Sequence, residues 1–200
     1  MVPQLLFLPG VGADPAFWRP LGELLPPSWR KTYMGWPGLG AQPRDPAVNS
    51  YDDLYGLVES AMGDGPVDLI AQSMGGAIAL AVALRHPGRV RRLVLTATSG
   101  GVDMGALGAT DWRADYRKSY PNAAPWITDW RPDMAELIGN IPHPALLLWG
   151  DADPISPLAV GQRLATLLAN ARLHVVPGGD HGFARDRPKA VVDLIAHHLR

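Results

Sequence analysis

Residues 69–79 read LIAQSMGGAIA and lead from an apolar strand through a serine directly into an apolar helix. Ser73 therefore stands at a sharp strand-to-helix turn, where the backbone is strained. Ala71 and Gly75, two positions to either side, are small, and larger side chains there would clash with the neighbouring strand or helix. Gly76 then allows the helix to pack closely. The pattern favours a nucleophilic serine, although a lone serine before a helix is most often only an N-cap.

Apolar runs of strand length alternate with helical patterns along the rest of the chain. We expect strands at 4–8, 31–35, 67–71, 92–97, 145–149 and 172–177, and most of them are near-continuously apolar, as in strands buried on both faces. We expect helices at 15–25, 50–62, 74–85, 157–169 and 188–199. This alternation predicts a three-layer α/β/α sandwich around a mostly parallel sheet of about six strands.

One segment does not fit the alternation. The chain has 200 residues, 47% of them hydrophobic, and no shift in composition divides it, so we expect a single domain over 1–200. The stretch of about 99–143 is too long for a connection in a compact domain and is rich in glycine, proline and aromatic residues. We interpret it as a short lid inserted after the fourth strand.

Charge and cysteine content exclude several classes of protein. The formal net charge of −1 argues against a nucleic-acid or membrane partner, because both need a concentrated basic surface. The chain has no cysteine, which excludes disulfides, a thiolate nucleophile and cysteine-ligated zinc. Residues 1–8 have no positive region and too short an apolar run for a signal peptide or a membrane span, so we expect a cytoplasmic protein.

Two loops can supply the groups that a serine nucleophile needs. A serine hydroxyl reacts poorly at neutral pH without a base within hydrogen-bond reach and a carboxylate that orients the base. WGDADPISP at 149–157 follows the fifth expected strand, and PGGDHGF at 177–183 follows the sixth. Both loops fall at the carboxyl ends of strands, where open α/β sheets place their sites. Ser, then Asp, then His is also the chain order of one known triad arrangement.

With these motifs the chain resembles, over essentially its whole length, the small serine esterases of the α/β-hydrolase superfamily. The resemblance implies that Asp153 is the acid of the triad and His181 the base. Asp151 is the competitor, but an aspartate at a turn commonly caps its own backbone. Asp103, after the fourth strand, is a further candidate that we rank below Asp153. The remaining histidines, including those of the C-terminal helix, which we expect to be exposed, have structural explanations.

An acyl-transfer site also needs hydrogen-bond donors for the developing oxyanion. The loop LPGVGAD at 8–14 matches the family's H-G-x-G segment, with Pro9 in place of the usual histidine. By that match the donors are the backbone N–H groups of Val11 and Met74. The loop could instead hold a phosphate in a dinucleotide fold, but Pro15 stands where the third glycine of that motif belongs.

Aromatic residues are the candidates for substrate contact. Trp36 belongs to GWPGLGAQ at 35–42, which resembles the family's D-x-P-G-x-G-x-S turn. Trp112 and Tyr116 belong to the aromatic-rich lid. We expect these three residues to bind substrate. The alternatives are that the segment with Trp36 is only a tight turn and that the lid residues only anchor the lid to the sheet.

Together these observations predict a serine hydrolase that cleaves a small carboxylic ester through an acyl-enzyme intermediate. The expected partner is a small-molecule ester, with no metal and no organic cofactor; the sequence leaves the oligomeric state open. Methyl esterases of carrier-bound acids are among the nearest analogies. The alternatives are a thioester or carbon–carbon bond hydrolase with the same triad, or a slow-turnover ligand-binding signalling protein of the same fold.

Overall fold

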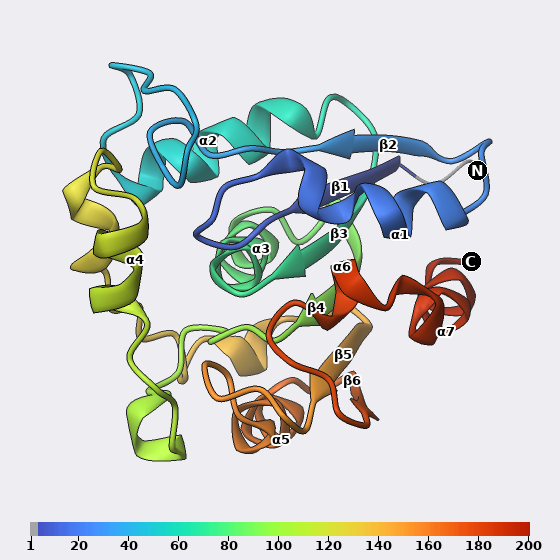
Figure 1. Cartoon of the computed structure of the whole chain (residues 1–200). Coiled ribbons are helices and arrows are strands. Elements are labelled where there is room, and N and C mark those ends of the chain that lie inside the picture. The colour runs from blue at the N-terminus through green and yellow to red at the C-terminus, as the bar shows by residue number, and fades with distance from the viewer. Residues whose placement is uncertain (1–3) are drawn as a thin grey trace.

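A six-stranded sheet forms the middle layer of the molecule (Figure 1). The computed structural model describes residues 4–200. The strand order is β2-β1-β3-β4-β5-β6, and every neighbouring pair is parallel. The bounds are Gln4–Leu8 for β1, Arg30–Tyr33 for β2, Val67–Gln72 for β3, Val90–Thr96 for β4, Ala145–Gly150 for β5 and Ala171–Val176 for β6. The parallel sheet predicted from the sequence is confirmed.

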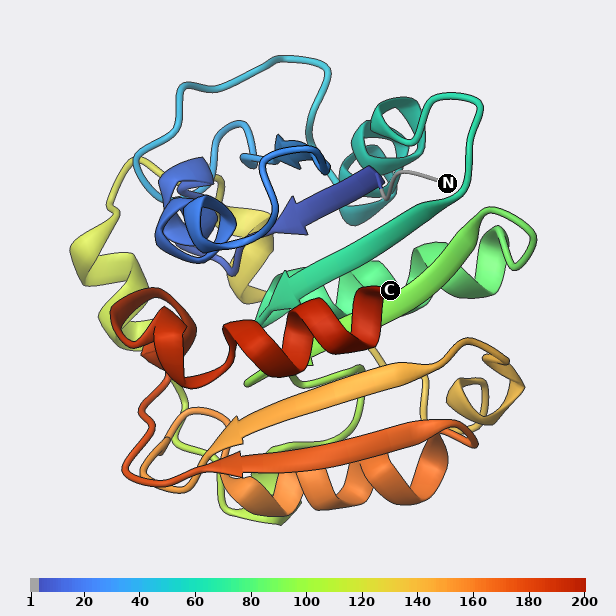
Figure 2. The ribbon, with the colours of Figure 1, turned by 90° about the vertical axis from the view of Figure 1, so that its right-hand side faces the viewer.

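Helices cover both faces of this sheet (Figure 2). One face carries α2 (Tyr51–Ala61), α3 (Met74–Arg85) and α5 (Leu158–Leu167); the other carries α1 (Arg19–Leu24), α6 (Phe183–Asp186) and α7 (Val192–Leu199). Strand β1 serves both layers, because successive side chains of a strand point to opposite faces. Leu6 and Leu8 enter the core beneath α2 and α3, whereas Leu5 and Phe7 enter the core beneath α1 and α7.

Two of the expected helices are shorter than the sequence pattern indicated. Residues 15–25 divide into a 3-10 turn at Pro15–Trp18 and the separate helix α1, whose first turn contains Pro20. A proline has no amide N–H, so it starts a new helix more readily than it continues one. At the C-terminus, Pro188–Ala190 form another 3-10 turn, and α7 begins only at Val192.

The two outer strands differ from the four inner ones. Strands β3 and β5 are buried along their whole length, whereas the residues of β2 alternate between exposed and half-buried, and so do those of β6 except for its buried last residue. An edge strand has a neighbour on one side only, so its polar residues, such as Arg30 and Arg172, reach solvent. Burial on both faces therefore holds for the middle of the sheet.

The part of the inserted segment that contains α4 lies beyond the carboxyl ends of the strands, on the side toward which the arrows point, and the last part returns to the amino end of β5 (Figure 2). The segment contains α4 (Arg113–Ser119) and three short 3-10 turns at Gly105–Leu107, Pro125–Thr128 and Ile138–Asn140. Tyr116, Ile127 and Ile138 are buried in the same core as α2 and α3. No helix within residues 4–200 is both long and apolar enough to span a membrane.

Candidate active site

Ser73 occupies the turn between β3 and α3 in a backbone conformation that non-glycine residues seldom adopt. Its φ is 52° and its ψ is −122°, and such strain persists only where the surroundings enforce it. A side chain at Gly75 would collide with the carbonyl oxygen of Leu8, and one at Gly76 would collide with Thr98. The small residues recognised in the sequence therefore let the turn approach β1 and the chain after β4.

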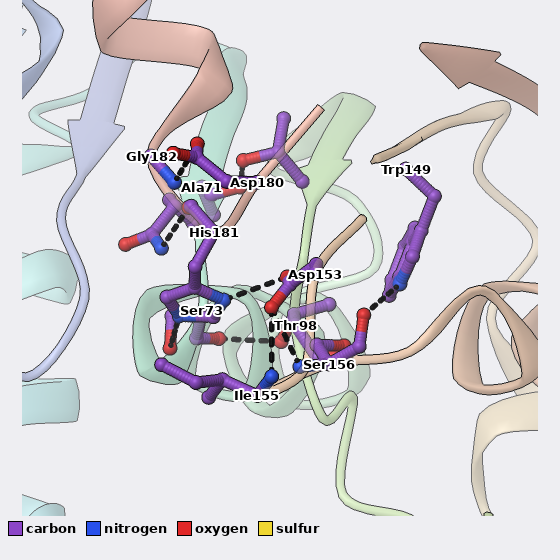
Figure 3. Close-up of polar contacts among 12 residues, drawn as sticks. Ala71, Ser73, Thr98, Trp149, Asp153, Ile155, Ser156, Asp180, His181 and Gly182 are labelled. Atoms are coloured by element: carbon purple, nitrogen blue, oxygen red, sulfur yellow. Dashed lines mark hydrogen bonds and ion pairs between the residues drawn. The ribbon is translucent and has the colours of Figure 1, made fainter. Parts of the chain in front are cut away.

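Three side chains from three loops form one hydrogen-bonded chain (Figure 3). The Nε2 atom of His181 lies 3.0 Å from the hydroxyl of Ser73, and its Nδ1 atom lies 2.8 Å from Oδ2 of Asp153. With the proton on Nδ1, the imidazole donates to the carboxylate and accepts from the serine hydroxyl. His181 is one-quarter exposed, while the Asp153 side chain is fully buried.

The buried carboxylate of Asp153 is fixed by the backbone of its own loop. Its Oδ1 atom accepts hydrogen bonds from the N–H groups of Ile155, at 2.8 Å, and Ser156, at 3.1 Å. A buried carboxylate must be hydrogen-bonded or paired, and these two backbone donors satisfy one of its oxygens. The second oxygen therefore remains available to His181 in a set direction.

Further polar residues, which the sequence analysis did not single out, hold these loops together. Gln72 donates from Nε2 to the carbonyl of His181 at 3.1 Å. Ser156 donates from its hydroxyl to the carbonyl of Thr98 at 3.1 Å, and Thr98 donates to the carbonyl of Ser73. The sequence could have indicated Gln72, because it is the polar residue at the end of a buried strand. It could not have indicated Thr98, because only the fold brings this residue beside Ser73.

The competing aspartates lie elsewhere. Asp151 accepts a 2.6 Å hydrogen bond from the N–H of Gly178, in the loop after β6, and not from its own turn as expected. Asp103 accepts from the N–H of Gly105 at 3.0 Å and lines the cavity described below. Within residues 4–200, His181 contacts Asp153 and neither of these two.

The two backbone amides expected to bind the oxyanion lie next to Ser73. Val11 and Met74 border the same cavity as the serine, and neither N–H donates to an acceptor in the described residues. The carbonyl of Pro9 accepts a 2.9 Å hydrogen bond from the indole N–H of Trp36, and that of Leu8 accepts from Trp18 at 3.1 Å. Tryptophans thus support this loop, in which the histidine of the family motif is missing.

A cavity of about 480 Å³ opens beside Ser73 and is roofed by the lid. Near the serine its lining is apolar, with Val11, Met74, Val102 and Ile155. Farther out the lid adds charged side chains, among them Asp111 and Arg113. These two are hydrogen-bonded at 2.9 Å, and Arg113 lowers the pKa of Asp111.

Of the three expected substrate contacts, only Trp112 lines this cavity. Trp36 does not line it, because its ring is fully buried and its N–H donates to the carbonyl of Pro9. Tyr116 does not line it either: its hydroxyl accepts the N–H of Gly40 at 2.8 Å, and burial raises the pKa of this hydroxyl. Tyr116 therefore anchors the lid, the alternative role considered from the sequence.

One histidine of the C-terminal helix also differs from expectation. His198 is half-buried, and its Nε2 atom lies 3.0 Å from the carbonyl of Leu93. Burial lowers its pKa. His197, its neighbour, is exposed as expected. The i, i+1 pair points in different directions around the helix, so only one of the two can face the sheet.

Comparisons with known proteins find relatives among the hydrolases. The family described as alpha/beta hydrolase fold matches residues 3–131, and the family described as TAP-like protein matches residues 112–200. A pimeloyl-(acyl-carrier protein) methyl ester esterase of Neisseria meningitidis is 28% identical over 90% of this chain and 87% of its own. A 2-hydroxymuconate semialdehyde hydrolase of a Pseudomonas species is 30% identical over 69% of this chain and 64% of its own.

A solved structure extends the likeness to the whole fold. The meta-cleavage product hydrolase of Pseudomonas fluorescens superposes with a TM-score of 0.78 over 98% of this chain and 90% of its own, at 21% identity. The six parallel strands, the serine turn and the matched sequence family give one result: the chain belongs to the α/β-hydrolase fold family.

Proposed function

We propose that this protein is a serine hydrolase that cleaves a small carboxylic ester through an acyl-enzyme intermediate. The hydrogen-bonded chain from Ser73 through His181 to Asp153, at a strained turn beside unused backbone amides, carries the proposal. No other nucleophile with a base in reach borders this cavity within the described residues. The ester as substrate is supported by the name of the Neisseria relative.

Each residue has one role in the reaction. His181 takes the proton as the oxygen of Ser73 attacks the ester carbonyl, and Asp153 stabilises the imidazolium that results. The negative charge on the carbonyl oxygen is met by the N–H groups of Val11 and Met74. Losing one such donor costs about 3–4 kcal/mol of transition-state stabilisation in other serine hydrolases. His181 then protonates the leaving alcohol, and water releases the acid by the same steps.

Removing the nucleophile tests this proposal. Ser73→Ala should abolish turnover of short p-nitrophenyl esters, with a loss in kcat on the order of 10⁶-fold and an unchanged melting temperature. A fluorophosphonate should leave one adduct, on Ser73, as found by peptide mass spectrometry. An adduct elsewhere, or none on active protein, would contradict the assignment.

A carbon–carbon bond hydrolase is the second candidate, because one relative of 30% identity is named as a hydrolase of 2-hydroxymuconate semialdehyde. Such an enzyme would use the same triad. Assaying a meta-cleavage product beside p-nitrophenyl butyrate separates the two reactions, since an esterase should prefer the ester by orders of magnitude. Product formation that stops at one equivalent per protein would instead favour the ligand-binding alternative.

A further inference from the structure

A second cavity lies beside Ser73 and His181. It measures about 350 Å³ and shares Val11, Ser73 and His181 with the larger cavity under the lid. Otherwise the two linings are different. The second cavity is bounded by the loop 9–14, by the chain after His181 and by Tyr120 at the end of α4. The reacting atoms therefore lie where two separate spaces meet.

The two linings offer different groups to a substrate. The larger cavity has apolar side chains that suit an alkyl chain, such as Met74, Val102 and Ile155, together with charged side chains from the lid that include the ion pair of Asp111 and Arg113. The second cavity is lined by several polar residues, Gln72, Tyr120 and Arg185 among them. An apolar acyl chain would desolvate these groups without replacing their hydrogen bonds, which is unfavourable.

Two of these polar groups have hydrogen-bonding capacity to spare. The Tyr120 hydroxyl has no hydrogen-bond partner among residues 4–200, and the Nη1 atom of Arg185 has none there either. Arg185 uses Nε and Nη2 on the carboxylate of Asp186, at 2.7 and 3.0 Å. That pair is neutral overall, and Asp14 adds a negative charge to the same lining. The site is therefore suited to uncharged hydroxyl groups rather than to an anion.

His181 decides which half of an ester belongs in this space. The proton that it takes from Ser73 must pass to the oxygen of the leaving alcohol as the bond between that oxygen and the acyl carbon breaks. Gly182, which follows His181, and Gln72, which binds its carbonyl, line only the second cavity. Met74, whose N–H is proposed to bind the oxyanion, lines only the larger one.

From these observations we infer that the second cavity is the leaving-group subsite and takes a neutral, hydroxylated alcohol larger than methanol. The acyl half of the substrate lies in the larger cavity. The inference rests on the proposed function, because it assigns the two halves of the ester that Ser73 attacks. In acylation one alcohol leaves with the proton of Ser73, and in deacylation one water restores that proton and releases the acid.

Three butyrate esters test the assignment: methyl, propyl and 2,3-dihydroxypropyl butyrate. The last two share a three-carbon alcohol and differ by two hydroxyl groups. The wild type should hydrolyse the dihydroxypropyl ester with a kcat/KM about 5-fold above that of the propyl ester, as expected for one or two added hydrogen bonds. Tyr120→Phe should lower this ratio about 3-fold. A ratio at or below one in the wild type would overturn the inference.

Filling the cavity gives an independent test. A Cβ atom at Gly12 meets no atom within 4 Å, and Gly12 lines the second cavity, so Gly12→Leu should narrow this cavity. Its dihydroxypropyl-to-methyl ratio of kcat/KM should fall at least 10-fold. Ala109→Leu narrows only the larger cavity. It should change the ratio of kcat/KM between hexanoate and acetate esters. The dihydroxypropyl-to-methyl ratio of kcat/KM should stay as in the wild type.

The outcomes separate the two proposals. Wild-type protein that neither hydrolyses any of these esters nor reacts with a fluorophosphonate would overturn the proposed function, and the subsite with it. If the wild type is active but neither Gly12→Leu nor Tyr120→Phe changes the ratios of kcat/KM between esters of different alcohols, the subsite alone is overturned. If Gly12→Leu fails to fold, as seen by circular dichroism, these ratios for Tyr120→Phe decide between the outcomes, because this variant removes one hydroxyl and no packing.

Discussion

The loops that bear the triad and the lid above them are held in different ways. Asp153 is oriented by two backbone N–H groups, and the chain at His181 is tied to Gln72 by a further hydrogen bond. The lid has hydrogen bonds to the body of the protein, such as that from the N–H of Gly40 to Tyr116, but it also rests on stacked rings: Trp130 stacks on Tyr51 with ring centroids 3.6 Å apart. Hydrogen bonds fix direction, whereas stacked rings tolerate small shifts. From this comparison we expect that the loops determine rate and that the lid determines which acyl group fits.

The largest effect expected in the loops comes from the acid. Asp153→Asn should lower kcat about 10⁴-fold, because an amide cannot hold the productive imidazole tautomer or stabilise the imidazolium. Asp151→Asn is the matched control, since it keeps an oxygen that can accept from Gly178. It should cost less than 3-fold. Both variants are assayed with p-nitrophenyl butyrate after their melting temperatures have been compared.

Equal losses of kcat in these two variants would contradict the assignment of Asp153, rather than Asp151, as the acid. A larger loss for Asp103→Asn would transfer the acid to the chain after β4. Either result would also remove the argument that directional hydrogen bonds at this loop determine rate.

A smaller effect is expected from the residue that holds the histidine loop. Gln72→Met keeps the volume of the side chain but removes its hydrogen bond to the carbonyl of His181. A misplacement of about 1 Å can cost on the order of 10²-fold in rate, and we expect a loss in kcat of up to that size with KM nearly unchanged. A purely structural role would instead lower the melting temperature and leave kcat intact.

The sequence predicted the sheet well because its evidence is local. Strand β3, the turn at Ser73 and helix α3 follow one another within a few residues, and each is specified by small or apolar side chains. The fold class and the family are both confirmed. The catalytic roles of Ser73, His181 and Asp153 stay predictions, although the structure brings the three side chains together.

The aromatic residues were predicted less well because their partners are distant in sequence. Trp36 and Pro9 lie 27 residues apart, and Tyr116 and Gly40 lie 76 apart. No periodicity reports whether such a ring faces a cavity or packs against a loop. Trp112 lines the cavity and Tyr116 does not, although both come from the same stretch of lid.

Two tryptophans that contact the ring of Tyr51 test whether the lid determines which acyl group fits. Trp130 stacks on Tyr51 and lines the larger cavity, whereas Trp126 meets Tyr51 edge-on at 5.2 Å and does not line it. Trp130→Leu should change the ratio of kcat/KM between octanoate and acetate esters about 10-fold. Trp126→Leu should leave that ratio within 3-fold of wild type. Similar shifts in both variants would mean that the lid acts by its general position.

The smallest expected effect lies where the lid rejoins the sheet, two residues before β5. His143 is buried, and its Nε2 atom has no hydrogen-bond partner among the described residues. Burial lowers the pKa of His143 in the folded protein, although a hydrogen bond with the backbone of Ala83 opposes this. An unfolded histidine titrates near pH 6.5. As the pH falls through that value, His143 becomes protonated in the unfolded chain but stays neutral in the folded one. The free energy of unfolding therefore decreases on acidification.

Replacing this histidine should therefore flatten the dependence of stability on pH. Urea unfolding at pH 7.5, 6.5 and 5.5 would give the free energy of unfolding for wild type, His143→Gln and the exposed-site control His197→Gln. We expect a shallower decline for His143→Gln than for the other two, and some decline should persist because burial also lowers the pKa of His198. Parallel declines in all three proteins would show that His143 gains its proton without unfolding. The junction of lid and sheet would then be open enough to admit water, and the lid would be held more loosely than its aromatic contacts indicate.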